Sequence, residues 1–185
     1  MAREWSVSAD RNGYVNRYEI DTAGLSVLDL NDHGVLTWMA VLLKNRTFAL
    51  TSPLAKEAHD YLIRTFGIDY GSADIIRGYR ADDSYFSFAQ DFLNGTISVR
   101  QLSKALKLGE LGEQIVIRSP KAFQRISFIG AEETDSLVWY PKRKARDEKA
   151  RNEYCSTDKM SYIRGDIYVV RIIEEEMTKD DERLQ

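Results

Sequence analysis

Cysteine and long apolar runs are the scarcest features of this sequence. Cys155 is the only cysteine among 185 residues, so the chain can form neither an internal disulfide nor a zinc site with several thiolate ligands. A lone cysteine is typical of a reducing compartment, and we predict a cytoplasmic location. No apolar run approaches the roughly 20 residues that span a bilayer, and the first five residues lack the apolar stretch of a signal peptide. Membrane insertion is therefore not expected.

The chain also lacks an excess of either charge. Its 26 basic and 29 acidic residues give a formal net charge of -3, so no long-range positive field attracts nucleic acid or anionic lipid. A basic run at 142–146 is followed by acids at helical spacing, as in Arg143 with Asp147 and Lys149 with Glu153. We interpret this run as a solvated, self-paired helix face and do not expect a nucleic-acid partner.

Histidine is scarce as well, and this limits metal and nucleophilic chemistry. His33 and His59 are the only histidines, and neither has a ligand cluster or a nucleophile nearby in sequence. Asp82 and Asp83 could hold a metal, but a carboxylate just before a helix is usually a cap. We therefore predict no metal site and assign structural or solvent-exposed roles to both histidines.

The sequence contains enough apolar residues to form one hydrophobic core. Hydrophobic residues make up 43% and charged residues 30% of the chain, which is typical of a globular domain. A length of 185 residues fits a single domain over 1–185, with a polar, frayed tail at 178–185. The sequence has no internal repeat, low-complexity tract or interdomain linker, and its composition leaves the oligomeric state open.

Several segments have the pattern of strands. The alternation at 14–20 predicts a half-buried strand, and turn residues at 21–24 favour a hairpin with a second strand at 25–30. A short strand is predicted at 75–80. The β-branched run at 113–118 is typical of a strand buried on both faces, so we place it at the centre of a mixed sheet with 125–129 beside it.

Helical spacing recurs between these strands. Asn31 or Asp32 is predicted to cap a central, apolar helix at 35–43, and Ser52 caps an amphipathic helix that Gly67 ends. Ser98 and Gln101 have the spacing of a capping box. Further helices are predicted at 86–93, after an Asp82 or Asp83 cap, at 102–106, at 142–154 and at 165–177. The fold class is therefore α/β (α+β), with a mixed sheet and several helices.

Glu113 is the acid with the most interesting position. It stands at the mouth of the predicted buried strand, behind a glycine-containing loop at 107–112, where it could project into a cleft and meet a small ligand. No second catalytic group can be paired with it from the sequence. Spacing alone therefore favours an ordinary solvated residue at a strand end.

From Trp5 to Tyr154 the chain resembles a bacterial family known only as a domain of unknown function and regarded as related to ADP-ribosyltransferase toxins. The matching segments are 13–19 (GYVNRYE), 28–31 (LDLN), 43–46 (LKNR), 78–86 (GYRADDSYF), 111–116 (LGEQIV) and 140–144 (YPKRK). The resemblance implies the C-terminal part of an ADP-ribosyltransferase fold that uses NAD as its substrate and transfers ADP-ribose to a protein acceptor or to water.

The resemblance also assigns roles to individual residues. Glu113 looks like the glutamate that holds the nicotinamide-ribose hydroxyl, while Arg80 and Tyr85 are the candidates for further contacts with NAD. The loop at 107–112 would present the acceptor. Glu110 in this loop and Gln114 just after it are the candidate residues for contacts with the acceptor. Leu111 stands where arginine-modifying relatives carry an acid or glutamine, a difference that argues against arginine as the acceptor.

The chain departs from the family at its start. Related domains open with two strands that grip NAD, and members of this family begin with a Tyr-His-Gly element that does not precede Trp5 here. The resemblance therefore implies that half of the NAD cleft lies outside this polypeptide. Two functions stay open: an enzyme or enzyme remnant that transfers or hydrolyses the ADP-ribose of NAD, and a noncatalytic interaction module such as a toxin partner or immunity-type protein.

Overall fold

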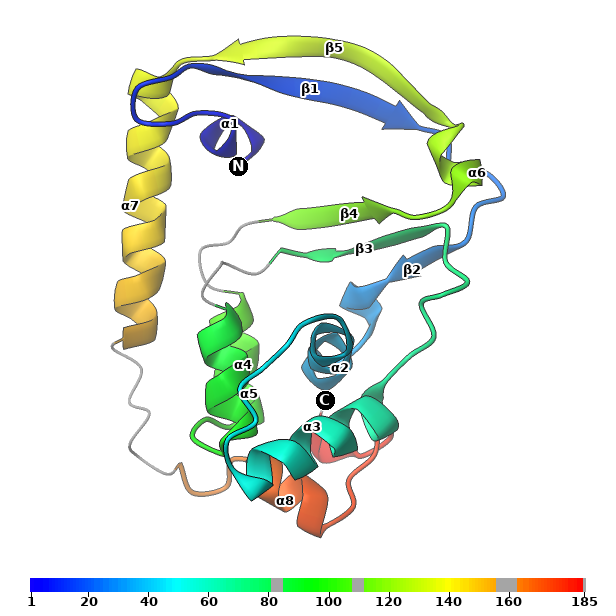
Figure 1. Cartoon of the computed structure of the whole chain (residues 1–185), viewed down its shortest axis with the longest axis vertical. Helices are drawn as coiled ribbons and strands as arrows, with labels where there is room; N and C mark the ends of the chain where they lie inside the picture. Colours follow the sequence, from blue (N-terminus) through cyan, green and yellow to red (C-terminus); the bar gives the residue numbers. More distant parts are fainter. Residues whose placement is uncertain (81–84, 108–111, 156–162, 185) are drawn as a thin grey trace.

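The protein is a mixed α/β structure built from two small sheets and a group of helices (Figure 1). The computed structural model describes residues 1–80, 85–107, 112–155 and 163–184. A two-stranded ribbon forms the top of the view in Figure 1, and a long helix runs down from one of its ends. A three-stranded sheet lies in the middle, with most of the helices below it. The predicted fold class is confirmed.

The elements follow one another along the chain as short, mostly alternating units. The helices are α1 (Ala2–Trp5), α2 (Val35–Asn45), α3 (Pro53–Phe66), α4 (Tyr85–Leu93), α5 (Val99–Leu106), α6 (Pro120–Phe123), α7 (Ser136–Cys155) and α8 (Val169–Glu174). The strands are β1 (Gly13–Ile20), β2 (Val27–Asp29), β3 (Ile75–Tyr79), β4 (Glu113–Ile117) and β5 (Ile126–Thr134). Single 3-10 turns cover Leu30–Asp32 and Glu182–Leu184.

The ribbon joins two strands that lie far apart in the sequence. β1 pairs antiparallel with β5, with Tyr14 opposite Glu133 and an irregularity between Arg17 and Tyr18. The predicted hairpin between β1 and the following strand is therefore wrong. The turn itself forms, with the amide of Ala23 donating to the carboxylate of Asp21 and Gly24 at a φ of +69°. It carries the chain from the ribbon to the other sheet instead of reversing it.

The second sheet has the order β2-β3-β4, with β2 parallel and β4 antiparallel to the central β3. β4 is thus an edge strand in the described part of the chain, and our prediction of a central strand buried on both faces is wrong. Ile115 and Val116 are 55% and 44% exposed. The strand predicted beside β4 is β5, but it pairs with β1. An apolar β-branched run favours a strand without specifying which neighbours cover it.

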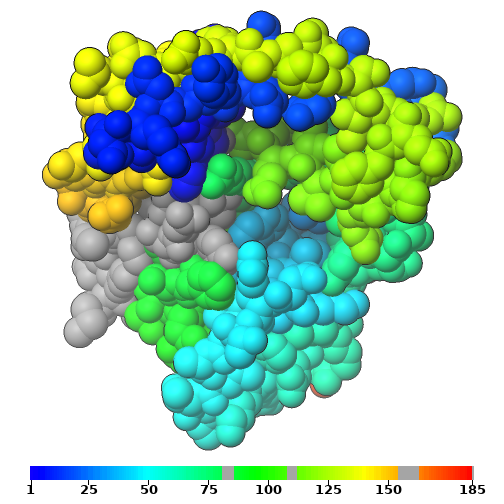
Figure 2. All heavy atoms as spheres, turned by 45° about the horizontal axis from the view of Figure 1, so that its top comes forward, coloured from blue at the N-terminus to red at the C-terminus, as the bar shows by residue number. Residues whose placement is uncertain are grey.

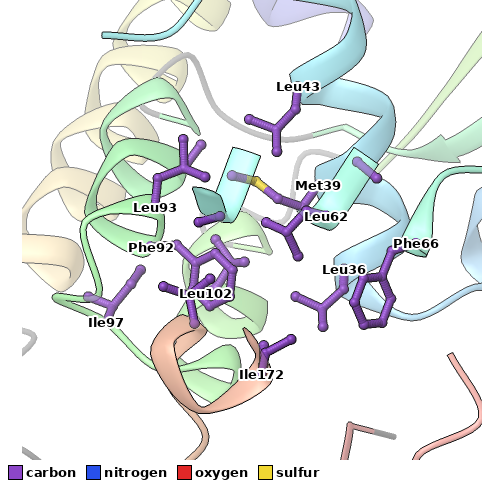
Figure 3. Close-up of a cluster of buried hydrophobic side chains, with 14 of the residues drawn as sticks. Leu36, Met39, Leu43, Leu62, Phe66, Phe92, Leu93, Ile97, Leu102 and Ile172 are labelled. Atoms are coloured by element: carbon purple, nitrogen blue, oxygen red, sulfur yellow. The ribbon is translucent and has the colours of Figure 1, made fainter. Parts of the chain in front are cut away.

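The hydrophobic core lies among the helices and not within the sheets. α2, α3, α4, α5 and α8 contribute side chains that are almost completely buried, among them Met39, Leu62 and Phe92. Figure 3 shows these side chains converging from separate helices on one cluster. The predicted central role of the helix that begins at Val35 is confirmed. Burial of large apolar side chains is the main source of stability here.

Local capping signals in the sequence are partly confirmed. Ser52 caps α3 through the amide of Ala55, and Ser98 and Gln101 form the predicted capping box at the start of α5. The N-cap of α2 is Gly34, so Asn31 and Asp32 do not cap it. The predicted caps Asp82 and Asp83 lie outside the described residues.

The capping box carries a first prediction about stability. The Ser98 hydroxyl donates to the Asp166 carboxylate at 2.8 Å, and its oxygen accepts from the Gln101 amide, all in buried surroundings. Ser98→Ala should lower the free energy of unfolding by about 1–2 kcal/mol, because it removes a cap and one partner of a buried carboxylate. Urea denaturation of both proteins measures the difference. Ser72→Ala, in an exposed turn, is the control, and an equal loss there would contradict the assignment.

α7 connects the ribbon to the rest of the molecule. It begins at Ser136, before the predicted start, and contains Pro141 within its first turns. The predicted ion pairs Arg143–Asp147 and Lys149–Glu153 are present on its surface. Within the described residues, no helix is both long enough and apolar enough to cross a bilayer.

The C-terminal residues have defined contacts with the helical body. The Lys179 ammonium donates to the carbonyl of Gly67, and Arg183 pairs with Asp181 and Glu175. The helix expected at 165–177 is shorter, since α8 ends at Glu174. Residues 178–184 of the predicted tail thus contact the C-cap of α3 and Glu175 after α8.

Candidate functional site

Glu113 is the first residue of β4, and its side chain is held by a neighbouring amide. The Asn31 Nδ2 group donates to Glu113 Oε1 at 3.0 Å. The Oδ1 atom of the same amide accepts from the backbone N–H of Tyr79 at 3.1 Å. Asn31 therefore ties the turn after β2 to both β3 and β4. Glu113 is exposed, so its second carboxylate oxygen can reach solvent or a ligand.

An ion pair lies next to this carboxylate. Arg77 on β3 pairs with Asp29 on β2, and these two residues are direct neighbours in the sheet. The backbone N–H of Asn31 and the Arg77 guanidinium hold the pKa of Asp29 below its ordinary value of 3.8. Asp29 and Glu113 in turn raise the pKa of Arg77. Burial raises the pKa of the Tyr79 hydroxyl to about 12, so this group stays protonated at neutral pH.

The Asp29 carboxyl group gives a prediction about pH dependence. Its lowered pKa in the folded protein means that its contribution to stability is present above pH 3.8 and is lost as the pH falls through the folded value. Arg77→Gln should raise the pKa of Asp29 without restoring it fully, because the Asn31 amide still donates to the carboxylate. A carboxyl carbon NMR titration measures this shift. Arg17→Gln, on exposed β1, should leave the Asp29 titration unchanged, and an equal effect there would contradict the pairing.

Arg80 follows β3 directly and lies at the same end of the sheet as Glu113. Its backbone N–H donates to the carbonyl of Gly112 at 2.8 Å, which extends the β3–β4 ladder by one step. Gly112 has a φ of +74°, a conformation that residues with side chains rarely adopt. The guanidinium of Arg80 lies 4.1 Å from the ring centre of Trp5 on α1, and that of Arg143 on α7 lies 4.3 Å from the same ring.

These contacts place two arginines around one aromatic ring, close to the start of β4. Cations above an aromatic face are attracted by its electron density. The Trp5 ring therefore holds both guanidinium groups without neutralising their positive charge. Arg143 also pairs with Asp147, whereas no acidic partner of Arg80 occurs among the described residues. This end of the sheet therefore combines a carboxylate, an amide and two guanidinium groups.

A hollow separates the ribbon from the lower sheet. Figure 2 shows it as a deep opening beneath the blue N-terminal segment and the yellow-green β5. β4 is the strand of the lower sheet that lies nearest to the ribbon in Figure 1. Its outer edge pairs with no other strand in the described ranges, so backbone groups and the side chain of Ile115 remain accessible there.

The predicted site residues are only partly brought together. Glu113 and Arg80 lie at one end of adjacent strands. Gln114 follows Glu113 on β4, so its side chain lies on the opposite face of the sheet. Tyr85 begins α4, but the placement of its side chain is not described. Glu110 lies outside the described residues.

Several residues of this site could not be recognised as functional from the sequence alone. Asn31 had the sequence pattern of a helix cap, and only the pairing of β2 with β3 brings it to Glu113. Arg77 was visible as a charged residue within an apolar strand. The approach of Trp5 and Arg143 to Arg80 depends on the packing of α1 against α7, which no local pattern predicts.

Metal-ligating residues are dispersed in the described part of the chain. No group of three or more His, Cys, Asp or Glu side chains there could hold a metal ion. His33 is exposed, and His59 contacts the carboxylate of its neighbour Asp60. The chemistry of the site therefore rests on carboxylate, amide and guanidinium groups.

Comparison with known proteins identifies a family. Residues 1–128 match the family described as "Protein of unknown function (DUF3990)". Because the match covers more than half of the 185 residues, the chain belongs to this family. No curated protein and no solved structure matches the chain. The predicted resemblance to a family of unknown function is confirmed, and the relation to ADP-ribosyltransferases stays a prediction.

Proposed function

We propose that this chain is an ADP-ribosyltransferase-like domain that uses NAD as a substrate, with Glu113 as its catalytic carboxylate. The observation that carries the proposal is the position of Glu113. It is an exposed acid at the start of a strand, and Asn31 fixes its side chain. A carboxylate held in this way can act electrostatically without having to reorganise.

The proposed chemistry is cleavage of the bond between ribose and nicotinamide. As this bond breaks, its electron pair leaves with nicotinamide and positive charge develops on the ribose. Glu113 would accept a hydrogen bond from a ribose hydroxyl and stabilise that charge, more strongly in the transition state than in the bound substrate. Water or a nucleophile of an acceptor protein then attacks the ribose carbon and releases its proton to solvent.

The two arginines near Trp5 support binding of the diphosphate part of NAD. Arg80 and Arg143 are held over the same indole ring, and phosphate oxygens are favourable partners for guanidinium groups. Arg80 lies one residue beyond the β3 partner of Glu113, at the same end of the sheet. Metal ions have no part in this proposal.

The exposed position of β4 removes one argument for the enzyme and supports a second function. A carboxylate on a central, buried strand would have been shielded from water, whereas Ile115 and Val116 beside Glu113 are exposed. A free edge with apolar side chains on both faces is typical of a strand that receives another strand. We keep a noncatalytic interaction module as the alternative proposal.

Nicotinamide release distinguishes the two functions. An enzyme releases nicotinamide from NAD at a rate that falls when Glu113 is replaced by glutamine. A noncatalytic interaction module releases no nicotinamide with either side chain at position 113. The replacement then affects only the hydrogen bond with Asn31.

A further inference from the structure

A separate cavity lies between strands β3 and β4 and helix α2. Its volume is about 240 Å³. On the sheet side it is lined by Ile76 and Gly78 of β3 and by their β4 partners Val116 and Gln114. Gly78 matters for its shape, because a Cβ atom there would lie 3.0 Å from the side chain of Leu30.

The helix side of the cavity is formed by one stripe of α2. Trp38, Leu42 and the following C-cap residue Arg46 are spaced four residues apart, so they lie above one another on the same face. The Trp38 ring stacks on Tyr79 with ring centres 5.8 Å apart and an angle of 9° between the planes. This contact fixes the indole as a flat apolar wall.

Polar groups reach the cavity at few points. Arg77 is already paired with Asp29. Arg46 is exposed and has neither an acidic nor a hydrogen-bond partner in the described ranges, and the same holds for the amide of Gln114. Two donors without partners thus stand beside an apolar, aromatic wall. Binding sites for small molecules combine features of this kind.

We propose that this cavity binds a small aromatic carboxylate. The apolar ring of the ligand would lie between the Trp38 wall and Val116, and its carboxylate would accept hydrogen bonds from Arg46 and Gln114. A guanidinium binds a carboxylate through charge-assisted hydrogen bonds, which an uncharged amide cannot reproduce. The size of the cavity limits the ligand to about one ring with a short acidic arm.

This site is independent of the proposed enzyme function. The proposed ligand contacts are Trp38, Arg46, Gln114 and Val116, whereas the proposed catalytic group is Glu113, which Asn31 holds. A failure of the cavity to bind carboxylates would leave the proposal for Glu113 unchanged, and loss of nicotinamide release would not affect the cavity.

NMR titration of the whole chain with phenylacetate and with phenylacetamide tests the inference. The indole N–H signal of Trp38, assigned with Trp38→Phe, should shift saturably with phenylacetate, with a dissociation constant on the order of 1 mM. Phenylacetamide should bind about tenfold more weakly, because it lacks the charge. Arg46→Gln should reduce phenylacetate binding to the level of the amide.

Two further variants serve as controls. Lys44→Gln removes a nearby charge on the same helix but outside the cavity, and it should leave phenylacetate binding unchanged. Val116→Trp should block both ligands, and its exposed position on an edge strand allows the larger side chain without refolding of the core. Equal affinity for the two ligands, an unshifted Trp38 signal, or unchanged binding by Arg46→Gln would overturn the inference.

Discussion

Glu113→Gln is expected to lower the kcat of nicotinamide release by about 100-fold to 1,000-fold, the usual cost of removing one well-placed electrostatic group. The assay follows nicotinamide release by the whole chain at saturating NAD. Glutamine preserves the size of the side chain and one oxygen for Asn31, but it removes the charge that stabilises the ribosyl cation. The loss should therefore appear in kcat more than in the binding of NAD.

The matched control for this experiment is Glu19→Gln. Glu19 is also an exposed glutamate on a strand, but it lies on β1, away from Asn31 and Arg80. It should retain the rate of the unchanged protein, and circular dichroism should show that both variants are folded. Equal rates for Glu113→Gln and Glu19→Gln, or no nicotinamide release by the unchanged protein, would contradict the enzyme proposal. The interaction module would then be the better account of the exposed β4 edge.

The sequence predicts those parts of the fold that depend on neighbouring residues. Ser52 with the following proline, and Ser98 with Gln101, are local signals because a capping side chain bonds to a backbone amide three residues away. β1, β3 and β4 were also found near their observed bounds, since alternation and β-branched runs are local patterns, whereas β5 continues to Thr134, beyond its predicted end. Element type was therefore predicted better than the arrangement of the elements.

Strand pairing could not be predicted, because it depends on contacts between distant residues. The turn at 21–24 has hairpin chemistry, yet the Asp21 carboxylate accepts a hydrogen bond from Arg125 and the chain continues to another sheet. β1 then pairs with β5, more than one hundred residues later. No pattern within either strand specifies that partner.

The same limit applies to the candidate site. Glu113 was recognised because an acid before an apolar run is visible in the sequence, and Arg80 through the matching family segment. Asn31 contacts Glu113 and the backbone of Tyr79 only because β2 lies beside β3. The burial of β4 was misjudged for a related reason. The apolar side chains of a strand do not reveal whether helices, strands or solvent will face them.

Phe92→Ala should destabilise the protein more than any exposed aromatic substitution. Phe92 is fully buried in the helical core, where Figure 3 shows it beside Leu102 and Leu93. Removing a buried phenylalanine ring costs about 3–5 kcal/mol of unfolding free energy, from lost burial and from the cavity that remains. Urea denaturation followed by circular dichroism measures this loss.

Phe128→Ala on β5 provides the matched comparison. Phe128 is 60% exposed, and its described ring contact is an edge-on approach to Tyr18 with centres 5.5 Å apart. Its replacement should therefore cost no more than about 1.5 kcal/mol, the range of a single aromatic pair. The difference between the two variants measures how much of the stability lies in the helical core and how little in the ribbon. If Phe128→Ala were as destabilising as Phe92→Ala, the aromatic face of the ribbon would have to be covered in the folded protein, and the assignment of stability to the helical core would be wrong.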